Sequence, residues 1–162
     1  MNILIIYYSK SGHTEKVAKQ LSNELNADLR KIEEQTKRNG IFGYIKAGYD
    51  SLLGKRVVLV NPNFDVLKYD LIFFGTPTWA ARPAPPIITF MDNLDLKGKK
   101  VINFTTMMGN CGKTLNILRD LAGKKGANVL HSFSIISKKK GDMQILDEVN
   151  AVIEDLRNRN VL

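Results

Sequence analysis

Three stretches of polar and glycine residues, each directly after an apolar run, carry groups that could bind a ligand. The first is Ser9-Lys10-Ser11-Gly12-His13-Thr14. Its three hydroxyls surround one glycine, and a helix is predicted directly afterwards, so hydroxyls and backbone N–H groups would converge at a helix N-terminus. Gly12 would let the backbone approach an anion closely, while Lys10 and His13 could add positive charge. The pattern predicts a phosphate site; the alternative is that one hydroxyl merely caps the helix.

The second stretch, Thr76-Pro77-Thr78-Trp79-Ala80, carries the only tryptophan of the chain. On a loop at the end of a strand, this ring could stack on a flat ring system while the two threonines contact a polyol chain. The alternative is that Trp79 caps the core. A third stretch, Thr106-Met107-Met108-Gly109-Asn110 and Gly112, runs into another helix. Its backbone N–H groups would face the polar edge of the same ring.

The elements that must position these stretches alternate along the chain. Five apolar runs predict strands at Ile3–Tyr8, Ala27–Ile32, Leu71–Gly75, Val101–Thr105 and Asn128–Ile136. Between and after them, one-sided apolar patterns predict helices at Glu15–Leu25, Thr114–Ala122 and Met143–Leu156, and Pro83–Pro86 forms a stiff loop leading into a further helix. This alternation predicts an α/β fold, a doubly wound parallel sheet with helices on both faces. Ligands of such sheets bind at the carboxyl ends of the strands, where the three stretches would meet.

One segment, Arg38–Val60, does not follow the alternation and is interpreted as an insertion. It contains an aromatic-rich helical piece, Ile41–Leu53. Exposed aromatic side chains need covering, so this piece would serve as a lid or a homodimer contact. The alternative is a local excursion that packs on its own domain.

Composition limits the class of protein. With 162 residues, 44% of them hydrophobic and 25% charged, the chain is expected to form a single globular domain over residues 1–162. No apolar run approaches the roughly 20 residues that cross a bilayer, and Ile3–Tyr8 lacks the basic flank of a signal peptide. The single cysteine, Cys111, cannot form an internal disulfide. A cytoplasmic location is therefore the default expectation.

The net charge of +8 favours anionic partners. The lysines gather in short turn-like clusters without interleaved aromatic residues: Lys97, Lys99 and Lys100; Lys124 and Lys125; and Lys138, Lys139 and Lys140. A solvated basic surface is therefore favoured over a nucleic-acid site.

Other site types fit poorly. Gly112-Lys113-Thr114 suggests a phosphate-binding P-loop, but Met107 stands where that motif needs its first glycine. Two histidines and one cysteine have no metal-ligand spacing, so no metal is expected. Cys111 would be a reactive thiol beside a helix N-terminus or, as the favoured alternative, a small buried neighbour. We predict no catalytic acid or base: His13 would lie by the phosphate, and His131 in a strand is interpreted as structural.

The first two stretches carry a family resemblance. Ser9-Lys10-Ser11-Gly12-His13-Thr14 resembles the FMN phosphate loop of the flavodoxin-like superfamily, which has a hydroxyl residue, any residue, a hydroxyl residue, Gly, any residue and Thr after the first strand. Thr76-Pro77-Thr78-Trp79 resembles its second flavin loop, and the order of elements is similar over nearly the whole chain. The resemblance implies a five-stranded sheet in the order 2-1-3-4-5. It also implies FMN bound by Ser9–Thr14, Thr76–Ala80, Thr106–Asn110 and Gly112.

The chain also departs from the electron-carrying flavodoxins. Their loops near the flavin ring usually contain a Gly-Asp pair, whose peptide can turn to hydrogen-bond the one-electron-reduced ring, and a second stacking aromatic residue. Here Trp79 is followed by Ala80-Ala81-Arg82, and the third stretch has Met107 and Met108. Those carriers are also typically acidic. A cation such as Lys113 or Arg82 near the ring would instead stabilise the anionic, two-electron-reduced flavin.

These observations favour an FMN-dependent oxidoreductase that takes a hydride from NADH or NADPH and reduces a quinone, another small acceptor or a partner protein. Two alternatives stay open. One is a flavodoxin-type electron-transfer protein without its own substrate, and the other is a flavin-free interaction module that uses its basic face. One fold hosts many functions, so the fold alone does not choose among them.

Overall fold

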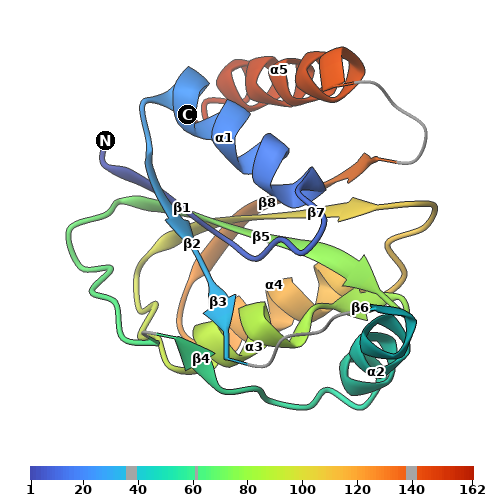
Figure 1. The fold of residues 1–162 in the computed structure, drawn as a ribbon. Coiled ribbons are helices and arrows are strands. Elements are labelled where there is room, and N and C mark those ends of the chain that lie inside the picture. Colours follow the sequence, from blue (N-terminus) through green and yellow to red (C-terminus); the bar gives the residue numbers. More distant parts are fainter. Residues whose placement is uncertain (36–39, 61, 138–141) are drawn as a thin grey trace.

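A computed structural model describes residues 1–35, 40–60, 62–137 and 142–162 of the chain (Figure 1). Its strands are β1 Ile3–Tyr7, β2 Asp28–Lys31, β3 Glu33–Glu34, β4 Leu59–Val60, β5 Leu71–Trp79, β6 Arg82–Pro83, β7 Lys100–Met107 and β8 Asn128–Ile136. Its helices are α1 His13–Leu25, α2 Gly40–Leu52, α3 Pro85–Asp92, α4 Thr114–Lys124 and α5 Asp142–Asn158. Every strand and helix that the apolar patterns predict is present.

The main sheet is a parallel one in the order β2-β1-β5-β7-β8, which is the predicted order 2-1-3-4-5. Pairing of β1 with β5 runs from Ile3 against Leu71 to Tyr7 against Gly75. The strand order reverses beside β1, because β1 is followed along the chain by its neighbour on one side, β2, and then by its neighbour on the other, β5. The loops after β1 and β5 therefore open at the same edge of the sheet, as ligand sites of doubly wound sheets require.

Helices cover both faces of this sheet (Figure 1). One apolar cluster joins alternate strand residues such as Ile5 and Phe73 to α1 and α5, and the other joins Leu4 and Phe74 to α3 and α4. The strands at the centre are almost fully buried, which explains their nearly unbroken apolar sequences. In α3, two prolines occupy the first helical positions, where a missing N–H costs nothing.

Strand β5 is longer than the sequence predicts, and the prediction that Thr76–Trp79 forms a loop is wrong. Thr76 and Pro77 continue the parallel pairing with β7. Thr78 and Trp79 then pair antiparallel with β6. Proline fits here because the pairing with β1 has already ended at Gly75, so the missing N–H of Pro77 removes no hydrogen bond on that side.

The insertion forms helix α2, as predicted, and a small antiparallel sheet of β3 and β4 that the sequence analysis did not anticipate. Its helix packs against β5, β6 and α3. The predicted start of the insertion, Arg38, lies outside the described residues. So do the side chains of Phe42 and Tyr44. The insertion therefore packs at least partly on its own chain.

Two lysines of the predicted basic clusters have structural partners. Lys99 Nζ donates to the carbonyl oxygens of Leu67 and Tyr69, at 2.6 and 2.9 Å. Lys125 Nζ donates to the carbonyl oxygen of Asp92. The cluster Lys138–Lys140 lies outside the described residues. Within the described ranges, no helix combines the length and apolarity that a bilayer crossing would need.

Candidate functional site

The loop after β1 has the geometry of an anion cradle. Gly12 caps helix α1 with a φ of +89°, a conformation that favours glycine, and a Cβ added there would meet no atom within 4 Å. Ser9 Oγ accepts the N–H of Gly12 at 3.2 Å and so holds the loop closed at its base. The N–H groups of the first helical turn have no acceptor within the helix. Open space over these donors suits a phosphate group.

The remaining residues of this loop differ in exposure. Ser11 is exposed, whereas Lys10 and His13 are half-buried. The Nδ1 atom of His13 is buried and has no hydrogen-bond partner among the described residues. A buried ring nitrogen usually has a polar partner, and an anion bound over Gly12 would supply one. Two observations thus fit a bound phosphate: the open space beside Gly12 and the buried Nδ1 atom of His13.

Thr14 joins the first stretch to the third. Its side chain is buried, and its hydroxyl lies 2.7 Å from the hydroxyl of Thr106 at the end of β7. If Thr106 is the donor, the Thr14 proton is left to point to another acceptor. The structure thus brings together two predicted site residues that are 92 positions apart in sequence.

Trp79 lies at the carboxyl end of β5 and is half-buried. Its ring packs edge-on against Tyr8, with centroids 5.6 Å apart and planes at 87°. Trp79 also contacts the core cluster on the α3 and α4 face. One part of the Trp79 ring therefore covers the core, and the rest remains accessible for stacking on a ligand.

The hydroxyls of Thr76 and Thr78 face inward. Thr76 is fully buried, and its Oγ1 accepts the N–H of Ala84 at 3.1 Å. Thr78 Oγ1 lies 2.9 Å from Thr105 Oγ1 and donates to Thr114 Oγ1 at 2.9 Å. These interior hydrogen bonds fasten the strand that carries Trp79; contacts of Thr76 and Thr78 with a polyol stay a prediction.

A two-residue turn, Ala80-Ala81, connects β5 to β6. Both residues have positive φ, +46° and +61°, which is the pattern of a type I′ turn and is usually made by Asn and Gly. The carbonyl oxygen of Ala81 accepts the N–H of Lys113 at 2.8 Å. Gly112 packs so closely that an added Cβ would lie 2.3 Å from the Cβ of Ala81. The start of α4 therefore holds this strained turn in place.

The third stretch is ordered by its own contacts. Met107 ends β7 and is half-buried, whereas Met108 is 71% exposed and Gly109 and Asn110 are exposed as well. Asn110 Oδ1 accepts the N–H of Gly112 at 2.6 Å, which bends the loop into α4. The exposed methionine lies in a loop at the same edge as Trp79 and the Ser9–Thr14 loop, where a planar ligand would cover it.

Of the other residues that the sequence analysis discussed, some lie at the candidate site and others lie elsewhere in the fold. Cys111 is free and half-buried in the third stretch. His131 lies in β8 and stacks on Phe133 with centroids 6.3 Å apart, which supports its structural interpretation. Arg82 lines a cavity on the α3 and α4 side of the β5–β6 turn. Both cations predicted near the ring adjoin the turn: Arg82 follows Ala81 and pairs with Trp79, and the backbone N–H of Lys113 donates to Ala81 O.

Beneath the cradle, burial raises the pKa of Tyr7 to about 12, and the negative charge of Glu15 adds to the effect. Hydrogen bonds from Lys19 and Lys31 lower the pKa of the Glu15 carboxyl. The lysine ammonium groups lie 2.8 Å from its two oxygens. The carboxylate beside the cradle is thus neutralised by two lysines, so it opposes a bound anion less than an unpaired carboxylate would.

Sequence reasoning missed two residues that shape this site. Tyr8 supports Trp79 and donates a hydrogen bond to Glu34 Oε1 at 2.7 Å. Ser51 of α2 donates to the carbonyl oxygens of Trp79 and Pro83, at 3.0 and 2.8 Å. Tyr8 was visible as the last residue of the first apolar run. Nothing local marks Ser51, because its partners lie about 30 positions away.

Comparison with known proteins agrees with this geometry. A family model described as Flavodoxin matches residues 2–145. An uncharacterized protein of Methanocaldococcus jannaschii is 29% identical over 136 residues, covering 82% of this chain and 73% of that protein. A flavoprotein from Lactobacillus acidophilus, solved in complex with FMN, has a TM-score of 0.68 and 26% identity, covering 92% of this chain and 98% of its own. A flavodoxin from the domain Archaea has a TM-score of 0.65 and 19% identity, with 98% of both chains covered, which shows the fold alone.

The matched residues 2–145 include the phosphate cradle, the Trp79 strand and the loop from Met107 to Gly112. They also contain the strands of the parallel sheet from β1 to β8. The match thus spans most of the chain and all three stretches of the candidate site. The chain belongs to the flavodoxin family.

Proposed function

We propose that this protein is an FMN-dependent oxidoreductase that moves two electrons from NADH or NADPH to a quinone, another small acceptor or a redox partner protein. FMN is the cofactor that family membership and the fit of the cradle support. When bound, FMN supplies a ring that accepts a hydride at N5 and passes two electrons on. The protein's part is to bind and orient it.

Three groups of residues would hold FMN. The Ser9–Thr14 loop would bind the phosphate through Gly12, the first-turn N–H groups of α1 and the Nδ1 atom of His13. Trp79, supported by Tyr8, would pack against the ring and exclude water from one side. The loop from Met107 to Gly112 would cover the far edge through backbone N–H groups and the exposed Met108.

The observation that carries the two-electron assignment is the Ala80-Ala81 turn. In carriers that stabilise one-electron reduction, a peptide beside the ring turns over. Turning the Ala80-Ala81 peptide while Ala80 keeps positive φ would convert the type I′ pattern into type II′, whose first position is normally glycine. The next peptide along is held as well, because Ala81 O accepts the N–H of Lys113 at 2.8 Å. A fixed turn disfavours the one-electron state.

Charge supports the same assignment. The net charge of +8 differs from the acidic character typical of carriers that dock on basic partners. Lys113, at the turn, would stabilise negative charge on a reduced ring. Basic surroundings would also favour the approach of an anionic dinucleotide.

A second candidate function is electron transfer between proteins without a small-molecule substrate. The Flavodoxin family model that matches residues 2–145 favours it. This candidate needs a separate reductase, whereas the oxidoreductase takes its electrons directly from NADH or NADPH. The two therefore differ in what NADH or NADPH alone does to the bound flavin.

The deciding experiment uses purified protein loaded with FMN under anaerobic conditions. NADH or NADPH is added, and the flavin absorbance is followed by stopped flow. For the oxidoreductase we expect bleaching without a transient long-wavelength band, and regeneration of the oxidised spectrum when a quinone is added. Bound flavin that stays oxidised with both nucleotides, but develops a stable long-wavelength band on photoreduction, would support the carrier instead.

A homodimer through α2 is also proposed. Tyr49 and Leu52 at the end of this helix and Leu53 directly after it are 57%, 55% and 53% exposed, which leaves three large apolar side chains for a partner to cover. We expect sedimentation velocity to show a dimer that the double substitution Leu52→Lys and Leu53→Lys dissociates. Leu67→Lys, at a residue that is 74% exposed elsewhere, is the control. A wild-type protein that sediments as a monomer would refute the dimer.

A further inference from the structure

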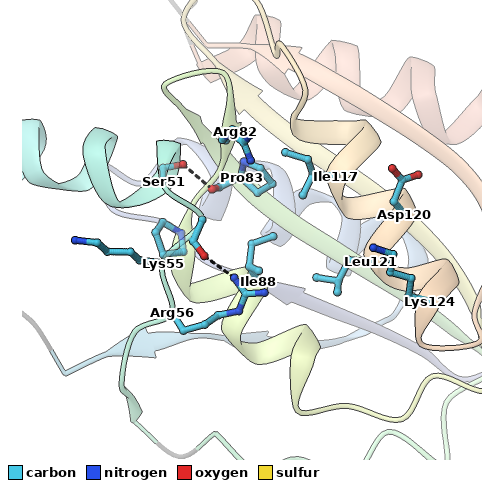
Figure 2. A pocket seen from close by; sticks show the side chains of 12 residues that line it. Ser51, Lys55, Arg56, Arg82, Pro83, Ile88, Ile117, Asp120, Leu121 and Lys124 are labelled. Atoms are coloured by element: carbon cyan, nitrogen blue, oxygen red, sulfur yellow. Dashed lines mark hydrogen bonds between the residues drawn. The ribbon is translucent and has the colours of Figure 1, made fainter.

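A cavity of about 300 Å³ lies beside β6, between this strand and the helices α3 and α4 (Figure 2). Residues of α2, the segment after it, β6, α3 and α4 line it. None of the residues assigned to FMN does so. Its volume is at the lower end of the range for small-molecule sites, about 300–1,000 Å³.

The floor of this cavity is apolar. It is made by Pro83 and Pro85 from the turn region and by Ile88, Ile117 and Leu121 from the facing helices α3 and α4. Figure 2 shows Ile88 and Leu121 between the side chains of Arg56 and Lys124. An apolar body that enters here would cover hydrophobic surface, which stabilises binding by about 25 cal/mol per Å².

The rim is predominantly basic. Lys55, Arg56, Arg82 and Lys124 line the cavity together with a single carboxylate, Asp120. Arg56 pairs with Asp92, and Lys55 pairs with Asp50 at 3.3 Å. In Figure 2, Lys55 extends away from the other labelled side chains. It therefore contributes less to the interior than the remaining cations do.

Arg82 and Lys124 differ from these two, because neither has an ion-pair partner within the described ranges of the chain. Asp120 lies one helical turn before Lys124, but its recorded ion pair is with Arg119, at 3.8 Å. Cations without ion-pair partners beside an apolar floor suit a ligand that carries an anionic group on an apolar skeleton. The planar guanidinium of Arg82 suits a carboxylate and also stacks on flat rings.

We propose that this cavity is a second ligand site, which binds a small aromatic carboxylate. The carboxylate pairs with Lys124, and the ring lies on Leu121, Ile88 and Pro83, towards Arg82 at the opposite end of the cavity (Figure 2). The proposal does not rest on the proposed electron transfer, since the cavity shares no residue with the FMN site. The two sites are mechanically connected through Ser51, which lines the cavity and bonds to the backbone of both Trp79 and Pro83.

The test uses 2-naphthoate as the probe and FMN-loaded, ¹⁵N-labelled protein. Calorimetry measures affinity, and amide chemical shifts locate the site. We expect shifts at residues 51–56, 82–88 and 117–124, and binding at least tenfold weaker for the neutral analogue 2-naphthamide. Repeating the titration on FMN-free protein separates this site from FMN binding, because failure to load FMN would leave the naphthoate result intact.

Three substitutions on helix α4 give matched variants at one element. Lys124→Gln is expected to weaken 2-naphthoate binding about three- to tenfold, and Asp120→Asn to strengthen it about two- to fivefold, because a repelling charge is removed. Arg119→Gln removes an exposed cation that does not line the cavity; because its exposed ion pair with Asp120, at 3.8 Å, is weak, binding should change by less than about twofold.

These side chains are exposed, so the three variants are expected to fold; melting curves check this. Opposite effects of Lys124→Gln and Asp120→Asn, with a less than twofold effect of Arg119→Gln, would support the site. The proposal is overturned if 2-naphthoate causes no shifts, if the shifts centre on residues 9–14 or 106–112, or if the neutral amide binds equally well.

Discussion

The hydroxyl of Thr14 lies 2.7 Å from the hydroxyl of Thr106, which fastens the first turn of α1 to the end of β7. Thr14 belongs to the phosphate loop, and Thr106 belongs to the strand that leads into the third loop. Both side chains are buried, so the bond fixes the distance between two parts of the site. The rigid parallel sheet thereby sets the position of the cradle.

Removing this bond tests whether it positions the cradle. Thr106→Val keeps the shape of the side chain but leaves the buried Thr14 hydroxyl without this partner, at a cost of about 1–2 kcal/mol in unfolding free energy. We expect FMN affinity, measured by fluorescence quenching, to fall several-fold. Thr89→Val is the matched control, since Thr89 Oγ1 also has protein partners, Val57 N–H and Pro85 O, but lies in α3. Equal affinities in the two variants would refute the positioning role.

The cradle itself depends on Gly12. Gly12→Ala forces alanine into a φ of +89° and places a methyl group in the open space over the first-turn N–H groups. We expect a loss of about 1–2 kcal/mol in unfolding free energy from the backbone and at least a tenfold loss in FMN affinity from the blocked cradle.

Gly98→Ala separates these two effects. Gly98 also has a positive φ, +74°, and open space around it, but it lies in the turn before β7, at the other end of the sheet. We expect a similar loss of stability with unchanged FMN affinity. An affinity loss in both variants would show that backbone strain, rather than the blocked space, weakens binding.

The Ala80-Ala81 turn gives a prediction about redox behaviour. Ala80→Gly removes the methyl group that makes peptide rotation costly in this turn, which has φ values of +46° and +61°. Relief of strain and the extra freedom of glycine nearly cancel, so unfolding free energy should change by less than about 1 kcal/mol.

We expect FMN-loaded Ala80→Gly to develop a long-wavelength absorbance band on photoreduction that the parent protein lacks. Asn26→Gly is the control, because Asn26 has a positive φ of +48° at the C-cap of α1, away from the carboxyl edge of the sheet. If the parent protein already shows the band, the turn does not restrict one-electron reduction.

The strand order followed from the family resemblance, whereas fold class was predictable because the central strands are buried on both faces. Their apolar residues are nearly unbroken, as in Ile3–Tyr7, and helices such as α4 show one apolar stripe. Where the strands end was less predictable. Thr76, Pro77 and Thr78 have the composition of a turn, and they continue β5 only because β7 and β6 supply partners from distant parts of the chain.

The same limit applies to the site. The hydroxyl and glycine spacing of Ser9–Thr14 was enough to predict a cradle at a helix N-terminus. The direction of the Thr78 hydroxyl was not, since it depends on strand alternation that begins only once β5 extends through it. The basic cavity depends on Arg56, Arg82 and Lys124 meeting from three separate elements, and no local pattern contains that information.

Packing under the site gives a stability prediction. A Cβ added at Gly75 would lie 2.1 Å from the ring of Phe104, which itself stacks on Phe133 at 5.7 Å. Gly75→Ala is therefore expected to cost about 3 kcal/mol or more in chemical denaturation. Gly123→Ala, in α4 with nothing within 4 Å, should instead stabilise by about 0.5–1 kcal/mol. A mild effect at Gly75 would mean that Phe104 repacks easily.

Tyr7 gives a pH dependence. Its pKa is raised from 10.0 to about 12, first by burial and second by Glu15, so the folded protein keeps a proton that the unfolded chain loses above pH 10. The unfolded state then binds fewer protons, and stability falls as pH rises from about 10 to about 12.

Tyr7→Phe keeps the ring and removes the titrating group. In urea unfolding at pH 9 and pH 11.5, we expect the variant to lose about 2 kcal/mol less than the parent between the two values. Tyr49→Phe, at a residue that is 57% exposed, should lose as much as the parent. Parallel losses in all three proteins would show that other groups govern the alkaline transition.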